Sequence, residues 1–208
     1  MTPERIQNTK YKVMNSLYQE QIKKVVIPQF KKIFSLKNNL EVPYITKVIV
    51  NTGIGRKLTK NQNNKELIEK ISQDLASLTG QKPALRPARH SIASFKIRKG
   101  MPIGMVVTLR GKRMGDFIYK FINVVIPRIR DFWGIPLKNI DKQGNLNYGL
   151  KNQLVFPEIS KEEKSISFGM EVTFVTNTQD REKAIELFRL LGFPLEKKEE
   201  EKADKNSR

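Results

Sequence analysis

The chain has no cysteine and a single histidine among its 208 residues. The absence of cysteine excludes disulfides, thiolate nucleophiles and metal sites built on thiolates. A metal cage rich in histidine is excluded as well, and a catalytic triad would have to run through His90, which has no carboxylate near it in the sequence. Gly53 and Gly55 follow a predicted strand, but Leu58 stands where a dinucleotide-binding loop needs its third glycine. We therefore expect no enzyme, no metal, no cofactor and no small-molecule substrate.

Long apolar runs are also missing. The longest, such as residues 25–27 and 124–126, have three residues, against the ~20 that a membrane-spanning helix needs. The first residues lack the charged-then-apolar layout of a secretory signal. Without cysteine or a signal, a cytoplasmic location is the simplest expectation. The basic, acid-poor start leaves an organelle interior open.

Acidic residues are scarce where basic ones gather. The chain has 39 Lys and Arg against 21 Asp and Glu, a net charge of +18. Residues 75–115 hold nine basic side chains and no acidic one, and residues 1–40 hold eight against two. Like charges repel on a shared surface, so an anionic partner is expected to compensate them. Nucleic acid is the favoured partner. The alternative is an anionic membrane surface, bound through the basic N-terminal helix.

The spacing of apolar residues predicts helices and strands in mixed order. Helices are expected at 10–26 with a continuation to 34, then at 64–79, 113–126 and 179–191, the last capped by Asn177 or Thr178. Strands are expected at 45–51, 83–86, 101–111, 153–156 and 166–176, with a turn-rich region at 134–149. This order predicts the α+β class, with a mostly antiparallel sheet and helices packed on one face. We expect one domain over residues 1–195 and a disordered tail over 196–208, where ten of 13 residues are charged.

Alternation along two strands predicts a polar sheet face. Val48 and Val50 point to one side, and Lys47, Ile49 and Asn51 to the other. In the returning strand Met105, Val107 and Leu109 take the core side, and Thr108 and Arg110 the polar side. A face that offers Lys47, Asn51, Thr108 and Arg110 suits the shallow groove and 2′-hydroxyls of structured RNA. Since it lacks an aromatic pair, we expect recognition of shape and not of stacked bases.

A basic segment joins the strands at 83–86 and 101–111, and we expect a long protruding hairpin loop there. Small residues, Phe95 and Ile97 alternate in it with cations, and no carboxylate balances them. Elsewhere, Phe132 and Trp133 could stack on a base, but the favoured interpretation places both in the core or in a lid over it.

Several ordered segments resemble one family. They are Thr79–Pro83 (TGQKP), Ser94–Gly104 (SFKIRKGMPIG), Val107–Gly111 (VTLRG), Pro127–Phe132 (PRIRDF), Phe156–Ile159 (FPEI) and Gly192–Pro194 (GFP). Together they are similar to the bacterial-type family of large-subunit ribosomal protein number five, which binds 5S rRNA. The similarity covers roughly residues 10–195.

The resemblance implies a sheet that docks on 5S rRNA, a basic loop that faces the peptidyl-site tRNA, and contacts with neighbouring ribosomal proteins, including a bridge to one in the small-subunit head. Asn51, Gln81 and Thr108 match the family's 5S rRNA contacts. With the cations of the acid-free stretch and the sheet, the expected rRNA surface is Lys47, Asn51, Gln81, Lys82, Thr108 and Arg110. The expected tRNA-facing residues are Arg89, His90, Ser91, Ser94, Phe95, Lys96, Arg98 and Lys99.

The chain also departs from the family pattern. His90 stands where lysine is usual, Trp133 stands where arginine is usual, and residues 140–145 differ from the usual segment. These departures leave the contacts near residues 133–145 open.

Overall fold

The computed structural model describes residues 18–58, 64–159 and 166–196. Five strands form one sheet with the order β2-β3-β1-β5-β4, and every neighbouring pair is antiparallel. The strands are β1 (Ile45–Gly53), β2 (Ala84–Pro87), β3 (Pro102–Leu109), β4 (Leu146–Leu150) and β5 (Met170–Thr176). The predicted α+β class is confirmed.

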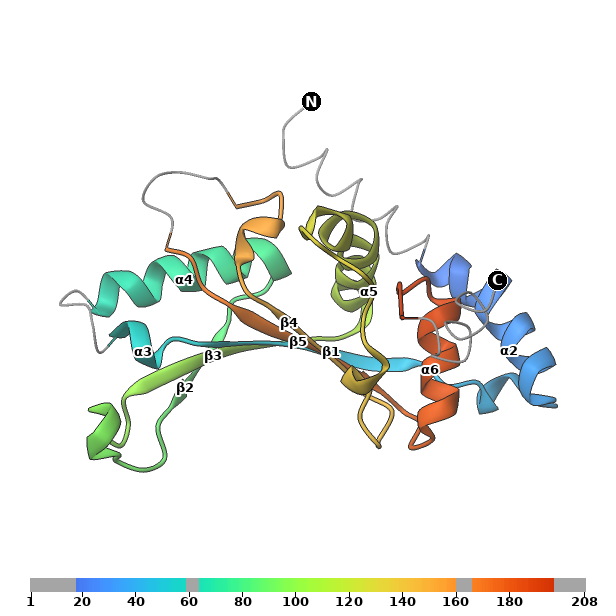
Figure 1. The fold of residues 1–208 in the computed structure, drawn as a ribbon, viewed down its shortest axis with the longest axis horizontal. Coiled ribbons are helices and arrows are strands. Elements are labelled where there is room, and N and C mark those ends of the chain that lie inside the picture. The colour runs from blue at the N-terminus through green and yellow to red at the C-terminus, as the bar shows by residue number, and fades with distance from the viewer. Residues whose placement is uncertain (1–17, 59–63, 160–165, 197–208) are drawn as a thin grey trace, which may run out of the picture.

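The α-helices lie on one side and at the ends of this sheet (Figure 1). They are α2 (Ile27–Phe34), α3 (Gly55–Leu58), α4 (Asn64–Thr79), α5 (Gly111–Lys120) and α6 (Arg181–Leu190). A π-helical turn, Ile22–Val26, leads into α2, and two further turns, Phe121–Val125 and Ile126–Arg128, extend α5. Figure 1 shows α4 and α5 over the same face of the sheet, as expected. In the described part of the chain no α-helix covers the middle of the other face, which we call the open face.

The core lies between the sheet and α4 and α5. Val48 and Val50 of β1 and Met105, Val107 and Leu109 of β3 are buried, as their alternation predicts. The predicted stripe of α4 meets them and is also buried: Leu67, Ile71, Leu75 and Leu78. Full burial of one such side chain contributes about 1.5–3 kcal/mol. Period-two strands facing a period-3.6 helix thus fix which sheet face stays open to solvent.

Lys120 ties three segments together on the helical side. Its Nζ donates to the backbone carbonyl of Leu78 at 2.6 Å and to a carboxylate oxygen of Glu158 at 2.7 Å. The ammonium also lies 5.6 Å from the ring centroid of Phe156. Its side chain is only 12% exposed, so these contacts replace most of its hydration. Lys120 therefore holds α4, α5 and the segment after β4 in a fixed relation.

Two predicted strand assignments were wrong. Residues 153–155 form a 3-10 turn, in which the fully buried Gln153 donates to Ile166 O at 2.8 Å and accepts from Phe168 N at 2.7 Å. The long strand predicted at 166–176 begins only at Met170, because residues 166–168 are bound to Gln153 instead. The missing strand is β4, inside the region predicted to be turns.

The ends of the predicted helices also need correction. Asp180, and not Asn177 or Thr178, caps α6, because its carboxylate accepts from Glu182 N at 2.9 Å and Lys183 N at 3.4 Å. Asn177 instead accepts a hydrogen bond from Tyr44 N at 2.8 Å. Residues 10–17 of the first predicted helix and residues 197–208 of the predicted tail lie outside the described residues.

Candidate RNA interface

Asn51 occupies the middle of the open face. It lies on the central strand β1, and its side chain is exposed. The register places it opposite Val106 of β3 and Glu171 of β5. Two positions away, Ile49 lies opposite Thr108 and Thr173. The prediction that Asn51 and Thr108 point away from the core is confirmed by this alternation.

Gln81 is brought to the same face by the turn that ends α4. Gly80 has φ of +68°, a value that costs glycine little, and Gln81 N donates to Thr79 Oγ1 at 3.3 Å. The Gln81 side-chain Nε2 then donates to the backbone carbonyl of Thr108 at 3.4 Å. Two residues predicted from separate motifs, 27 positions apart, are therefore neighbours.

Three of the predicted cations gather at one end of β1 and β3. Val48 pairs with Leu109, so Lys47 and Arg110 come next at the same end of these strands. Arg110 lies just past β3 and is the first, capping residue of α5. Lys82 precedes β2 and is exposed. Among the described residues none of these three cations forms a salt bridge, so each can neutralise a phosphate.

The structure adds polar residues that the sequence analysis did not single out. Glu171 is exposed opposite Asn51. Thr173 Oγ1 donates to Asn147 Oδ1 at 2.8 Å across β5 and β4. Alternation along β5 indicated that Glu171 and Thr173 face outward, but only the strand register places them beside Asn51. Asn147 was missed because β4 itself was not predicted.

The basic loop joins β2 to β3 and lies at the end of that hairpin (Figure 1). Ile92 and Ile97 exchange backbone hydrogen bonds of 2.9 and 3.1 Å, and Ser91 Oγ accepts from Lys99 N at 2.9 Å. At the tip, Lys96 adopts a left-handed φ of 54°. These bonds give the loop a defined path. Its eight predicted tRNA-facing residues are all exposed: Arg89, His90, Ser91, Ser94, Phe95, Lys96, Arg98 and Lys99.

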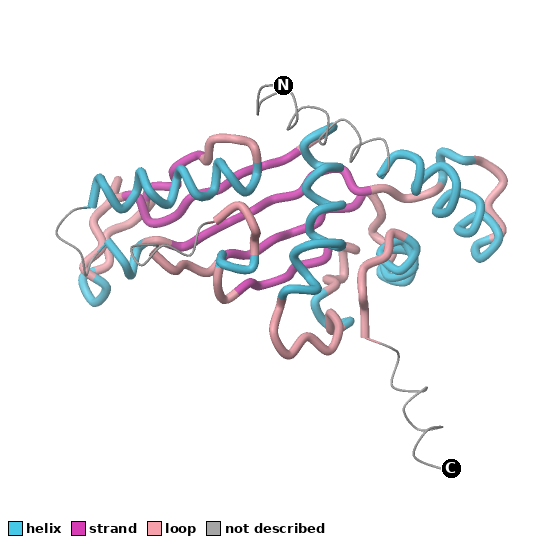
Figure 2. The backbone as a smooth tube through the Cα atoms, turned by 90° about the horizontal axis from the view of Figure 1, so that it is seen from above, coloured by secondary structure: helices cyan, strands magenta, loops and turns pink. Residues whose placement is uncertain are grey.

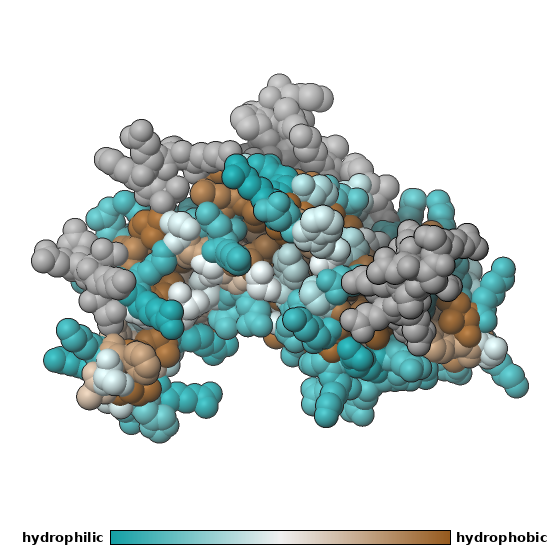
Figure 3. Space-filling view, in the orientation of Figure 1, coloured by the Kyte–Doolittle hydropathy of each residue, from teal (hydrophilic) through white to brown (hydrophobic). Residues whose placement is uncertain are grey.

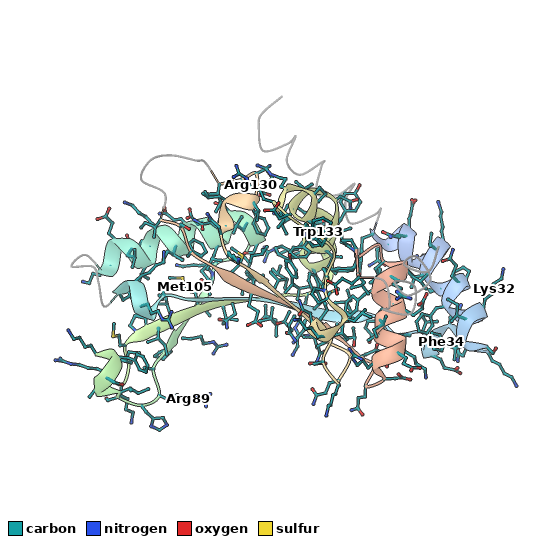
Figure 4. All side chains as sticks on the ribbon, in the orientation of Figure 1. Lys32, Phe34, Arg89, Met105, Arg130 and Trp133 are labelled. Atoms are coloured by element: carbon teal, nitrogen blue, oxygen red, sulfur yellow. The ribbon has the colours of Figure 1, made fainter. Side chains whose placement is uncertain are left out.

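The loop and the polar residues of the sheet are separate parts of one surface. In Figure 3 the outline of the molecule is hollowed below the sheet, between the loop at one end and the region of α6 at the other. Figure 4 shows Arg89 at the loop end, on the side of the sheet opposite α4 and α5. The open face and the loop can thus contact different parts of a large partner.

Phe132 and Trp133 do not share one role. Phe132 is half-buried, and its ring meets that of Tyr148 edge-on at a centroid distance of 6.4 Å, as expected for a core residue. Trp133 is 89% exposed, so its predicted place in the core or a lid was wrong. The alternation of neighbours in this turn places one aromatic ring inward and the next outward.

No helix in the described ranges combines the length and the apolar character that crossing a bilayer requires. The N-terminal helical segment also buries its apolar side. Val26 and Phe30 are 1% and 0% exposed, and Gln21 Nε2 donates to Leu191 O at 3.1 Å just after α6. Its largest apolar side chains are therefore not available to a lipid surface.

Comparison with known proteins identifies the family. A family described as "Ribosomal protein L5" matches residues 38–98, and a second family, described as the C-terminus of the same ribosomal protein, matches residues 102–195. Large ribosomal subunit protein uL5 of Dictyoglomus turgidum (strain DSM 6724 / Z-1310) is 47% identical over 184 residues, which are 88% of this chain and 100% of the relative. The chain belongs to the uL5 family of ribosomal proteins. The uL5 protein of Thermotoga sp. (strain RQ2) is 45% identical over 178 residues, 86% of this chain and 95% of the relative.

Membership of the uL5 family confirms several expectations. The chain is a protein of the large ribosomal subunit, and its partners are ribosomal RNA and other ribosomal proteins. The uL5 proteins are structural and not enzymes, and their place is the ribosome in the cytoplasm of bacteria. Ribosomal RNA accounts for the uncompensated positive charge, so the alternative of a membrane-binding protein is no longer needed.

Proposed function

We propose that the open face of the sheet binds 5S rRNA, with Lys47, Arg110 and Lys82 on phosphates and Asn51, Gln81 and Thr108 on sugar and base groups. The observation that carries this proposal is the convergence of Gln81 and Thr108 on a face that no described α-helix covers in the middle. Contacts to phosphate fix the register of a protein on RNA, and contacts to hydroxyls and base edges add discrimination.

The charge pattern of the open face supports a division of labour. Glu171 repels phosphate from the middle of the face, opposite Asn51. A carboxylate and an amide accept hydrogen bonds from 2′-hydroxyls or base amino groups, which phosphates cannot donate. Lys47 and Arg110 stand at the strand ends, about 13 Å of strand away from Asn51 in the case of Lys47. The phosphate backbone therefore crosses the cationic end, and a groove faces the middle.

We further propose that the loop from Arg89 to Gly100 faces the peptidyl-site tRNA, and that the chain takes part in a bridge to a protein of the small-subunit head. The exposed cations of the loop, held by the bonds of Ile92 and Ser91, support the first of these. Family resemblance alone supports the bridge, to which we assign no residues.

The salt dependence of 5S rRNA binding tests the division of labour. Each phosphate contact that is lost lowers the slope of log affinity against log salt by about 1. Lys47→Ala and Arg110→Ala should lower this slope, whereas Thr108→Ala should lower the affinity at an unchanged slope. A control with the same loss of charge is Lys138→Ala, an exposed lysine after α5. Equal slopes for wild type, Lys47→Ala and Arg110→Ala would remove the phosphate role from this end of the sheet.

A further inference from the structure

Trp133 is the single tryptophan of the chain, and neither the 5S rRNA face nor the basic loop includes it. It follows the helical segment that extends α5, which lies on the covered side of the sheet. Figure 4 shows Trp133 and Arg130 on that side, opposite Arg89. In the view from above, the loop after this helix extends beyond the sheet (Figure 2).

The backbone on both sides of Trp133 is held in place. Phe132 packs on Tyr148, and on the other side Ile135 is fully buried. Ile135 N donates to Pro194 O at 2.7 Å, and Ile135 O accepts from Glu196 N at 3.0 Å. The exposed indole is thus carried by a turn that is tied to the C-terminal segment.

Gly134 shows that this turn depends on its sequence. Its φ is +114°, and a Cβ there would come within 3.3 Å of Glu196 N. Only glycine fits both this conformation and this close approach. Because the backbone is already ordered, binding at Trp133 costs little further conformational entropy.

The surroundings of the indole are cationic and otherwise polar. Arg128 and Arg130 are exposed just before it, and neither belongs to a salt bridge among the described residues. Within residues 121–140, all of them described, Trp133 is the one exposed large apolar side chain. The centre of a protein interface usually joins several apolar side chains. A single aromatic face beside arginines is the arrangement that stacks on a nucleobase and holds the adjoining phosphates.

We propose that Trp133 stacks on an unpaired nucleobase of ribosomal RNA, with Arg128 and Arg130 on the flanking phosphates. The site rests on the family's partnership with ribosomal RNA and not on the assignment of 5S rRNA to the sheet. Since it lies on the covered side of the sheet, it reaches a segment of RNA other than the one docked on the open face.

Tryptophan fluorescence tests this directly, because emission excited at the red edge of the indole band comes from Trp133 alone. The full chain is titrated with deproteinised 5S rRNA and, separately, with deproteinised large-subunit rRNA, and complex formation is followed by filter binding. We expect at least one of these RNAs to quench the emission and to shield the indole from acrylamide. An unchanged emission in filter-bound complexes with both RNAs would overturn the site, as would absence of binding to both.

Variants measured on filters with the quenching RNA separate stacking from charge. Trp133→Ala should weaken binding by about five- to a hundredfold, and Trp133→Phe, which keeps an aromatic face, by about threefold or less. Equal losses in Trp133→Phe and Trp133→Ala would count against stacking. If quenching appears only in complete large subunits and not with either free RNA, a protein covers Trp133 and the proposal is wrong. Loss of 5S binding in sheet variants, with Trp133 quenching intact, would leave this site standing by itself.

Discussion

The side-chain amide of Gln81 donates to the backbone carbonyl of Thr108 at 3.4 Å, which joins the turn after α4 to the open face of the sheet. The carbonyl belongs to β3, next to the central strand β1. Gln81 therefore has one end fixed to the sheet, and its side-chain oxygen is held where RNA is proposed to bind.

Gln81→Ala should weaken 5S rRNA binding by about 1–3 kcal/mol, because a hydrogen bond to a desolvated RNA group is lost. Gln81 is only half-buried, so the melting temperature should change little. Filter binding and thermal unfolding measure the two effects. If the melting temperature falls as steeply as the affinity, Gln81 supports the turn and is not a contact.

Removing the cations of the loop should separate its role from that of the sheet. The triple variant Lys96→Ala, Arg98→Ala, Lys99→Ala is expected to keep 5S rRNA affinity within a few-fold and to reduce tRNA contact in the ribosome, measured by crosslinking to peptidyl-site tRNA. The matched control removes three exposed lysines from the N-terminal region, Lys23, Lys32 and Lys37.

That control should leave the tRNA crosslink unchanged. A large loss of 5S rRNA affinity in the loop variant, but not in the control, would move the loop into the 5S interface.

Lys120→Met should lower the free energy of unfolding by about 2–3 kcal/mol. The substitution keeps the apolar stem near Phe117 and Phe156 but leaves Leu78 O and the carboxylate of Glu158 without their charged donor. Denaturant unfolding measures the change. The exposed Lys70, paired with Glu66 at 2.7 Å, is the control, since an exposed helical pair is worth about 0.3–0.5 kcal/mol. Equal losses at both positions would show that partial burial of Lys120 adds nothing.

Asp116 predicts a pH-dependent gain in stability. Burial raises the pKa of Asp116, and the charges of Lys112 and Lys120 offset part of this. One of its carboxylate oxygens is buried without a hydrogen-bond partner within the described residues. Ionisation therefore costs more in the folded than in the unfolded chain, so stability is lost as the pH rises through the pKa of the folded state.

Asp116→Asn should thus raise the melting temperature at neutral pH, and the gain should vanish below about pH 4, where the wild-type carboxyl is protonated as well. Melting curves of both proteins across this range decide the matter. A gain that stays the same at low pH would place its origin outside the titration of Asp116.

The sequence predicted the faces of the sheet better than its edges. Regular alternation in β1 and β3 was enough to separate Val48 and Val50 from Asn51. The edge strand β4 was missed because Asn147 and Gly149 disfavour strands, and its formation depends on pairing with β5. The hydrogen bonds of Gln153 likewise overrode an apolar run that predicted a strand.

Site residues followed the same rule. Asn51 and Thr108 could be found by local periodicity, whereas Gln81 needed the family resemblance, because its contact with Thr108 joins distant segments. Trp133 was placed in the core because large aromatic side chains are usually buried. Only the turn that fixes Phe132 and Ile135 shows that the ring between them points to solvent.

The central claim is that polar side chains of the open face bind 5S rRNA, and Asn51→Ala tests it most directly. Asn123→Ala is the matched control, since Asn123 is an exposed asparagine on the helical segment after α5. Filter binding to 5S rRNA at fixed salt should show Asn51→Ala weaker than wild type by about 1–3 kcal/mol and Asn123→Ala unchanged, with both proteins folded by circular dichroism. Wild-type affinity in Asn51→Ala would contradict the account.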